Sequence, residues 1–327
     1  MNARLIVAVA LVSWVAGTQA QQGKAPRVGV LHGGNSKEAP SIQREPFEQG
    51  LREQGWIPGS SVQIDYRYAE GDPNRLAPLA AELVRSGVDV IVARGNTAID
   101  AARKATSTIP IVMSAWAGDP VSSGLAKSLS RPGGNITGVR VFAELDSKRL
   151  ELLKETFPAT LRVGVIGNPD FGRGEFAQQM EWLRASARLL KLEVQVFELR
   201  RPPDIDIVFA EIARTKLDAL LVRGDPIVMD PSRNQIVERI AKRRLPAIYQ
   251  WPFFVEAGGL MSYGERFSAF HRGAAGYVSR ILRGAKPGEL PIEQPQEFDL
   301  AVNLKTAKQL GLEIPNLVLL RATRVIE

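Results

Sequence analysis

Residues 88–95 read VDVIVARG, and residues 217–224 repeat the pattern as LDALLVRG, 129 positions later (217 − 88). In both copies a run of apolar residues stands between an aspartate and an arginine–glycine pair. A strand that is apolar on both faces belongs inside a parallel sheet that helices cover from both sides. We therefore predict central strands at residues 89–93 and 218–222, in two related α/β units.

Three further pairs of segments recur in the same order along the chain: residues 27–31 and 162–166, 62–64 and 194–196, and 109–112 and 245–248. Each half alternates such strands with amphipathic helices, for example at residues 45–54 ahead of Gly55. Because crossovers between parallel strands are right-handed, each half forms a doubly wound, Rossmann-like domain. The predicted fold class is therefore α/β, with two parallel-sheet domains and a cleft between them.

Turn-rich segments predict where the chain passes from one domain to the other. Residues 131–140 are rich in Pro, Gly and Asn, and the chain is expected to cross there. A glycine-flanked strand at residues 258–264, followed by a long helix from about 266 to 282, predicts further crossings. The domain prediction is a signal peptide at residues 1–20, a first lobe of residues 27–140 plus 260–290, and a second lobe of residues 141–259 plus 291–327. A three-segment hinge would join the lobes.

The N-terminus has the pattern of an export signal. Arg4 precedes an apolar run from Leu5 to Ala16, and small and polar residues then lead to Ala20, after which cleavage is expected. The apolar run is shorter than the roughly 20 residues that a membrane-spanning helix needs, although an uncleaved anchor is the alternative. We expect a soluble periplasmic protein.

Composition excludes several classes of chemistry. The 327 residues include no cysteine and only two histidines, His32 and His271, which leaves no disulfide, no thiolate metal site and little for zinc. The net charge of +7 comes from scattered basic residues without a nucleic-acid-binding motif, so a solvated basic surface is expected and nucleic acid is not an expected partner. Neither a cofactor nor a metal is expected.

Catalytic motifs are also missing. The sequence has no phosphate loop, no dinucleotide-binding glycine pattern after the first strand and no nucleophile elbow. An exported enzyme that uses Asp119 or Asp225 as a general base remains the alternative from another functional class.

Several motifs resemble those of one family of exported binding proteins. They are FEQGLREQGW at residues 47–56, IDYRYAEG at 64–71, SLSRPGGNITG at 128–138 and NLKTA at 303–307. In these motifs the chain is similar to the substrate-binding proteins of ABC transporters, including tryptophan-binding TrpX-like members. The resemblance implies the type I periplasmic binding protein fold and a hinged, two-lobed receptor for a small solute, with an amino acid favoured.

Ligands of open α/β sheets bind beyond the carboxyl ends of the strands, and this rule selects the candidate residues. The candidate ligand-binding residues are Gly34, Asn35, Gly95, Asn96, Thr97, Ser114, Trp116, Asp119, Asn168, Phe171, Arg223, Asp225, Tyr249, Trp251 and Tyr263. No catalytic residue is proposed.

Each chemical role has a structural alternative. Asn96 or Thr97 would cap a helix whose N-terminal amides suit a carboxylate, or would only cap it. Asp119 or Asp225 would bind an amine, or would only form a turn before proline. The four aromatic candidates at residues 116, 171, 249 and 251 would stack on a flat ligand, or would fill the core. Arg94 and Arg223, at matching places in the repeat, would bind an anion or form salt bridges.

The function expected from these observations is that of a solute-binding protein of an ABC importer. Its ligand would be an amino acid or a related carboxylate, with an aromatic side chain as one option, bound in the cleft between the domains. The expected partner is a permease in the inner membrane, and the protein is expected to be a monomer. A sensory domain that docks on a membrane receptor is a further alternative.

Overall fold

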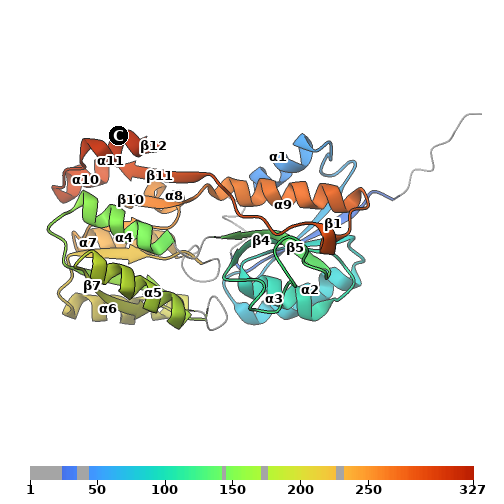
Figure 1. The fold of residues 1–327 in the computed structure, drawn as a ribbon, viewed down its shortest axis with the longest axis horizontal. Coiled ribbons are helices and arrows are strands. Elements are labelled where there is room, and N and C mark those ends of the chain that lie inside the picture. The colour runs from blue at the N-terminus through green and yellow to red at the C-terminus, as the bar shows by residue number, and fades with distance from the viewer. Residues whose placement is uncertain (1–23, 35–43, 142–144, 171–175, 226–231) are drawn as a thin grey trace, which may run out of the picture.

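Two separate β-sheets divide the chain into two lobes that lie side by side (Figure 1). The structure is a computed structural model, and it describes residues 24–34, 44–141, 145–170, 176–225 and 232–327. The predicted signal peptide and its cleavage site lie outside the described residues, as do two candidate site residues, Asn35 and Phe171.

The first sheet has five parallel strands in the order β2-β1-β3-β4-β5. Their bounds are β1 Arg27–His32, β2 Gln63–Tyr68, β3 Val90–Arg94, β4 Ile111–Ala117 and β5 Ile136–Val141. Helices α1 (Glu45–Glu53) and α9 (Phe267–Leu282) cover one face, and α2 (Leu76–Arg85) and α3 (Asn96–Ala105) cover the other (Figure 1). A short 3₁₀ helix, Pro73–Arg75, leads into α2.

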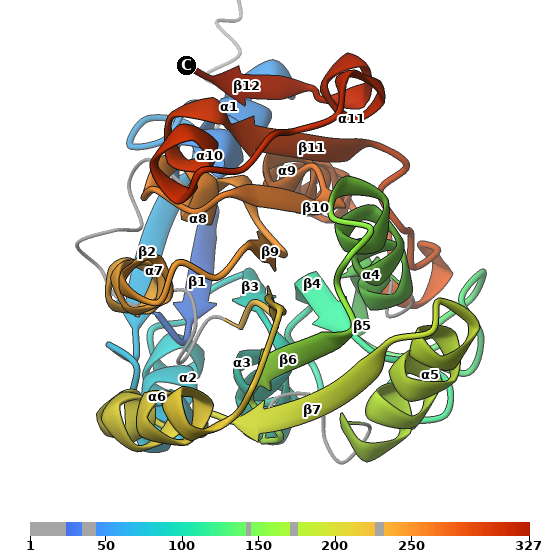
Figure 2. The ribbon, with the colours of Figure 1, turned by 90° about the vertical axis from the view of Figure 1, so that its left-hand side faces the viewer.

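The second sheet has seven strands in the order β12-β11-β10-β9-β8-β6-β7, parallel except where β10 meets β11. Their bounds are β6 Arg162–Gly167, β7 Glu193–Glu198, β8 Ala219–Val222, β9 Ala247–Tyr249, β10 Met261–Glu265, β11 Phe298–Asn303 and β12 Arg324–Ile326. The helices of this lobe are α4 Leu145–Thr156, α5 Phe176–Leu189, α6 Ile205–Arg214, α7 Arg233–Lys242, α8 Pro252–Glu256, α10 Leu304–Leu310 and α11 Asn316–Arg321. Figure 2 shows α4 and α5 on one side of this sheet and α6, α7 and α8 on the other.

The predicted repeat is present in the topology. The strand order β2-β1-β3-β4-β5 of the first lobe returns as β7-β6-β8-β9-β10 in the second, and β11 and β12 extend the second sheet. A hydrogen bond at the start of the first strand of each lobe is repeated as well. The backbone N–H of Arg27 donates to Asp89 Oδ2 at 2.7 Å, and that of Arg162 donates to Asp218 Oδ2 at 2.8 Å. The predicted fold class is confirmed.

The backbone pairing differs from the domain prediction at two boundaries, near residues 260 and 291. The prediction placed residues 260–290 in the first lobe, but β10 (Met261–Glu265) pairs with β9 and β11 of the second sheet. The chain enters the first lobe only after Glu265, to form α9. It leaves along residues 291–297, and Glu293 is still bonded to the backbone of β5 through Gly138 and Arg140. The pairing of β10 with β9 and β11 accounts for this difference, and the glycines on either side of β10 did not reveal it.

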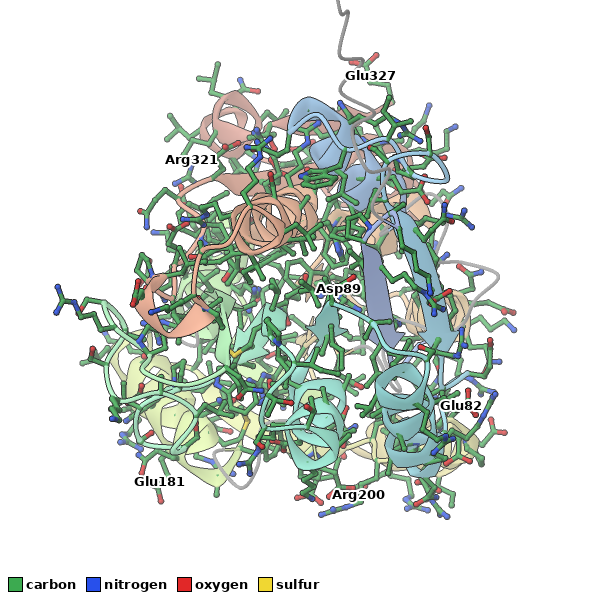
Figure 3. All side chains as sticks on the ribbon, turned by 90° about the vertical axis from the view of Figure 1, so that its right-hand side faces the viewer. Glu82, Asp89, Glu181, Arg200, Arg321 and Glu327 are labelled. Atoms are coloured by element: carbon green, nitrogen blue, oxygen red, sulfur yellow. The ribbon has the colours of Figure 1, made fainter. Side chains whose placement is uncertain are left out.

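The interior of each lobe is apolar, and charged side chains lie on the outside. Figure 3 shows side chains filling the space between helices and sheet, with exposed charges such as Glu82, Glu181 and Arg321 at the periphery. The 3₁₀ segments Pro202–Asp204 and Pro287–Glu289 complete the regular structure. Among the described residues, no helix is both long and apolar enough to traverse a bilayer.

Candidate functional site

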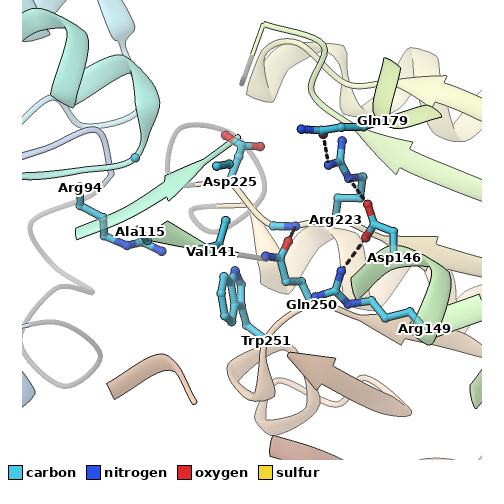
Figure 4. A pocket seen from close by; sticks show the side chains of 13 residues that line it. Arg94, Ala115, Val141, Asp146, Arg149, Gln179, Arg223, Asp225, Gln250 and Trp251 are labelled. Carbon is cyan, nitrogen blue, oxygen red and sulfur yellow. Dashed lines mark hydrogen bonds and ion pairs between the residues drawn. The ribbon is translucent and has the colours of Figure 1, made fainter. Parts of the chain in front are cut away.

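A cavity lies between the lobes, at the carboxyl ends of strands from both sheets (Figure 4). It contains about 550 Å³ of space free of protein atoms, part of which is open to solvent. Such a position, where loops leave parallel strands, is the usual ligand site of open α/β sheets. The first lobe contributes Arg94, Gly95, Ala115, Ala117 and Val141, and the second contributes Asp146, Arg149, Gln179, Arg223, Gly224, Asp225, Gln250 and Trp251.

One buried carboxylate organises the charged wall of the second lobe. Asp146 accepts from Arg149 Nη1 at 2.5 Å and forms an ion pair with Arg223 Nε at 2.8 Å (Figure 4). Arg223 Nη2 donates to Gln179 Oε1 at 2.5 Å, and Arg149 Nε donates to the carbonyl oxygen of Tyr263 at 2.6 Å. A carboxylate shared by two guanidinium groups leaves positive charge around Asp146, which favours an anionic ligand group there, while Asp225 elsewhere in the same wall brings the sum of the lobe's lining charges to zero.

The opposite wall carries one buried guanidinium. Arg94, the last residue of β3, is 5% exposed, and its Nη1 lies 2.9 Å from His32 Nε2. Its Cζ lies 4.8 Å from the centre of the Phe267 ring, a cation–π distance. Burial, with a further contribution from the charge of Arg94, keeps the pKa of His32 well below its usual value, so the imidazole is neutral.

An indole ring forms the floor of the cavity. Trp251 is 3% exposed and meets Phe267 and Phe270 edge-on, at ring-centre distances of 5.0 and 5.9 Å. Gly224 allows this arrangement, because a Cβ at that position would overlap the indole nitrogen and lie 2.6 Å from Cδ1. The backbone N–H of Gly224 donates to Gln250 Oε1 at 2.8 Å. The ring is therefore fixed in place before any ligand binds.

A bulge interrupts the end of β4, where two alanines of that strand reach the cavity. The pairing with β5 skips Ala115, which has a φ of +65° in the left-handed region. Ala115 and Ala117 line the cavity, whereas Ser114 and Trp116 face the interior of the lobe and are at most 1% exposed. Ser114 lines a second, smaller cavity of about 330 Å³ within the first lobe.

Four of the fifteen candidate residues line the interlobe cavity: Gly95, Arg223, Asp225 and Trp251. Nine described candidates do not line it: Gly34, Asn96, Thr97, Ser114, Trp116, Asp119, Asn168, Tyr249 and Tyr263. Asn35 and Phe171 lie outside the described residues.

Three of the polar candidates that miss the cavity, Asn96, Asp119 and Asn168, have structural partners. Asn96 is the first residue of α3 rather than its cap, and its side chain bonds both to the N–H and to the C=O of Ala117, at 2.8 and 2.6 Å. Asp119 and Asn168 each accept from a backbone N–H two residues on, as turn formers do. The residue before α3 is Gly95, and no side chain caps this helix.

The remaining candidates belong to the interior or to turns. Tyr249 is 1% exposed and stacks on Phe254 at 5.2 Å, and Tyr263 stacks on Phe298 at 6.1 Å. The N–H of Gly34 points at His32 Nδ1, 2.7 Å away. Thr97 follows Asn96 within α3, where its hydroxyl oxygen is buried.

The strand-end rule missed the lining residues that helices supply. Asp146 and Arg149 lie in the first turns of α4, and Gln179 lies in α5. Their signal in the sequence is weak, since an acid–base pair three residues apart is common on solvated helices. Gln250 was not among the candidate residues, although its neighbours Tyr249 and Trp251 were. Among the described residues, no group of three or more His, Asp or Glu side chains has the arrangement of a metal site.

Comparison with known proteins points to one family. A family model described as "ABC transporter substrate binding protein" matches residues 36–326. The chain is 28% identical over 279 residues to a tyrosine-binding protein of Clostridioides difficile strain R20291, covering 84% of this chain and 79% of that protein.

Solved structures are similar over nearly the whole chain. An ABC domain from Streptococcus pneumonia in complex with L-Trp has 27% identity and a TM-score of 0.83, covering 93% of this chain and all of that one. A conserved domain protein from Vibrio cholerae has 29% identity and a TM-score of 0.84, covering 92% of this chain and all of that one. The ligand-free, open structure of a substrate binding protein from Clostridium difficile scores 0.66 at 25% identity, covering 92% and 99%. The lobes are thus arranged more like those of the tryptophan complex than those of the open protein.

Proposed function

Since the chain belongs to the family of ABC transporter substrate-binding proteins, we propose that it binds one small solute in the interlobe cavity and passes it to a membrane permease. The family consists of extracytoplasmic binding proteins and not of enzymes. The observation that carries the proposal is the cavity itself, with charged groups from both lobes around a fixed indole ring. Closure of two hinged lobes on a ligand is the motion that this geometry supports.

The proposed ligand is an amino acid or a related carboxylate with an aromatic side chain. Arg94 and Arg223 offer guanidinium groups to a carboxylate, and Asp225 offers a carboxylate to an ammonium group. Trp251 offers an aromatic surface to a ring. The relatives named above support the same class, because one binds tyrosine and another was solved with L-Trp.

The proposed location is the periplasm, with the permease in the inner membrane. The support is the export pattern of residues 1–20 and the absence of a cysteine that could carry a lipid. Detection of a mature chain that begins at Gln21, in a periplasmic extract, tests this location.

Ligand binding is tested by thermal unfolding with a panel of solutes, followed by calorimetric titration. The panel contains L-Trp, L-Tyr, L-Phe, their deaminated acids, small carboxylates and sugars. A ligand at one hundred times its Kd stabilises the folded state by about 2.7 kcal/mol. Quantitative recovery of the unaltered ligand by mass spectrometry separates binding from catalysis.

A matched pair of variants ties binding to the cavity. Arg223→Gln removes a lining guanidinium, whereas Arg201→Gln removes an exposed one that pairs with Asp204 on the surface. We expect the first variant to lose at least tenfold in affinity and the second to bind as the unmodified protein does. Stabilisation by no aromatic amino acid or carboxylate in the panel would count against the proposed ligand class.

A further inference from the structure

Arg94 is a charged residue that lines two cavities at once. It is the one charged side chain that the first lobe contributes to the described lining, where its neighbours are glycine, alanine and valine. It also lines the smaller cavity inside the first lobe, so its guanidinium lies between the two spaces. Whatever holds Arg94 on the inner side therefore determines which N–H groups it presents to a ligand on the outer side.

His32 contacts Arg94 from the inner side. Nη1 of Arg94 lies 2.9 Å from His32 Nε2, and both residues are at most 5% exposed. A guanidinium has donors only, so this hydrogen bond requires an unprotonated Nε2. With Phe267 against its face, the guanidinium plane is held on two sides.

The surroundings of His32 favour the neutral ring. The groups around it are Arg94 on β3, His271 on α9 and Tyr68 on β2, whose ring centre lies 5.9 Å away. Arg44 and Tyr66 line the same small cavity, and Glu48 is paired with Arg44. No carboxylate among these described neighbours contacts the imidazole to stabilise a positive charge.

The other ring nitrogen also faces a donor. The backbone N–H of Gly34 lies 2.7 Å from Nδ1. A neutral imidazole accepts at one nitrogen only, so the two contacts compete. The contact with Arg94 is charge-assisted and therefore the stronger, which favours the tautomer with its proton on Nδ1.

We propose that His32 is the positioning residue for the solute's carboxylate: its neutral Nε2 fixes Nη1 of Arg94, so that the rest of the guanidinium faces the interlobe cavity. The proposal rests on the proposed function, because it assumes a carboxylate ligand in that cavity. His32 itself does not touch the ligand. It reduces the freedom that Arg94 would otherwise lose on binding.

Calorimetric titration with L-tryptophan and L-tryptophanamide tests the role, because only the acid carries a carboxylate. His32→Leu should weaken binding of the acid by about tenfold and leave binding of the amide unchanged. His32→Gln, whose amide oxygen is an acceptor, should restore most of the loss. His271→Leu is the matched control: it removes the other buried histidine of the same small cavity, whose Nε2 has no hydrogen-bond partner among the described residues, and should leave the acid-to-amide ratio unchanged.

A merely structural role for His32 would weaken the acid and the amide equally, and that result overturns the proposal, as does an unchanged ratio. Imidazole ¹⁵N spectra of the ligand-free protein give a second, independent measurement. We expect Nε2 of His32 to be unprotonated at neutral pH and to shift in Arg94→Gln, whereas a proton on Nε2 would overturn the proposal. If L-tryptophan fails to bind the unmodified protein, the proposed ligand class is wrong, and the spectra still decide the state of His32.

Discussion

At the scale of single residues, the lack of a side chain at Gly224 determines where the Trp251 ring lies in the cavity wall. Gly224 leaves the space in which the Trp251 indole lies, and a Cβ there would overlap the ring. Substitution must therefore displace Trp251 from its contacts with Phe267 and Phe270.

Gly224→Ala should lower affinity for aromatic ligands at least tenfold and reduce the free energy of unfolding by about 1–3 kcal/mol. Gly134→Ala is the control, since a Cβ there has no atom within 4 Å. Titration calorimetry and chemical denaturation measure the two effects. Unchanged affinity in Gly224→Ala would show that the position of Trp251 does not matter for binding.

Buried histidine makes stability depend on pH. Burial, and to a smaller extent the charge of Arg94, lowers the pKa of His271 from 6.5 to about 3. Below pH 6.5 the unfolded chain binds a proton at this position that the folded protein does not, so stability is complete above pH 6.5 and declines as the pH falls toward 3.

The contribution of His271 to the free energy of unfolding should fall by up to about 1.4 kcal/mol per pH unit in this range. His271→Leu should flatten the slope of stability against pH by that amount. Denaturant titrations at pH 6, 5 and 4.5 measure the slope in both proteins. Equal slopes would mean that His271 is protonated in the folded state.

Sequence reasoning at this scale succeeded where a residue follows a central strand. Arg223 and Gly95 were selected because they follow central strands, and both line the cavity. It failed for Asn96, because the bonds between its side chain and Ala117 join residues 21 positions apart. Nothing local distinguishes such a bond from a helix cap.

At the scale of secondary-structure elements, the contact between α1 and α9 depends on small residues. A Cβ on Gly50 of α1 would lie 2.9 Å from Ala275 Cβ and 3.1 Å from Arg272 Cα on α9. The second contact is with backbone, so the helices would have to separate.

Gly50→Ala should therefore lower the free energy of unfolding by about 1–3 kcal/mol, although alanine favours helices over glycine by about 1 kcal/mol. Gly276→Ala, on an open part of α9 with no atom within 4 Å, should instead be neutral or stabilising. Denaturation curves of the two variants check both signs. A more stable Gly50→Ala protein would mean that the helices are less closely packed than described.

The elements themselves were largely predictable. Apolar runs gave the central strands, and the long helix expected at about 266–282 is α9, Phe267–Leu282. The bulge at Ala115 was not predictable, because alanine rarely adopts the positive φ that it has here and nothing in the local sequence indicates it. The sheet to which β10 belongs was not predictable either, because its pairing with β11 joins segments more than 30 residues apart.

At the scale of the whole molecule, the lobes are arranged as in a closed receptor rather than an open one. The similarity to the tryptophan complex exceeds that to the open, ligand-free protein, at TM-scores of 0.83 and 0.66. Hinged receptors of this architecture close on their ligand. The location of the cleft followed from the repeat alone, because two sheets of the same strand order present equivalent strand ends to each other.

The radius of gyration in small-angle X-ray scattering should decrease when a saturating ligand is added, because the ligand selects closed molecules from a mixture. The Arg201→Gln protein should give the same decrease, and Arg223→Gln should need more ligand to reach it. An identical radius with and without a bound ligand would mean that the lobes do not move.

The path of the chain has a consequence for how the molecule is made. Helix α9 covers the sheet of the first lobe, but it comes after most of the second lobe in sequence, and the second sheet ends with β12, at residues 324–326. During synthesis the first lobe can therefore not bury its whole interior until α9 and residues 291–293 have been added, and the second sheet is not complete until β12 has been added. A chain shortened after residue 259 would leave both sheets bare on one face or edge, and it should be degraded rather than accumulate as a smaller receptor.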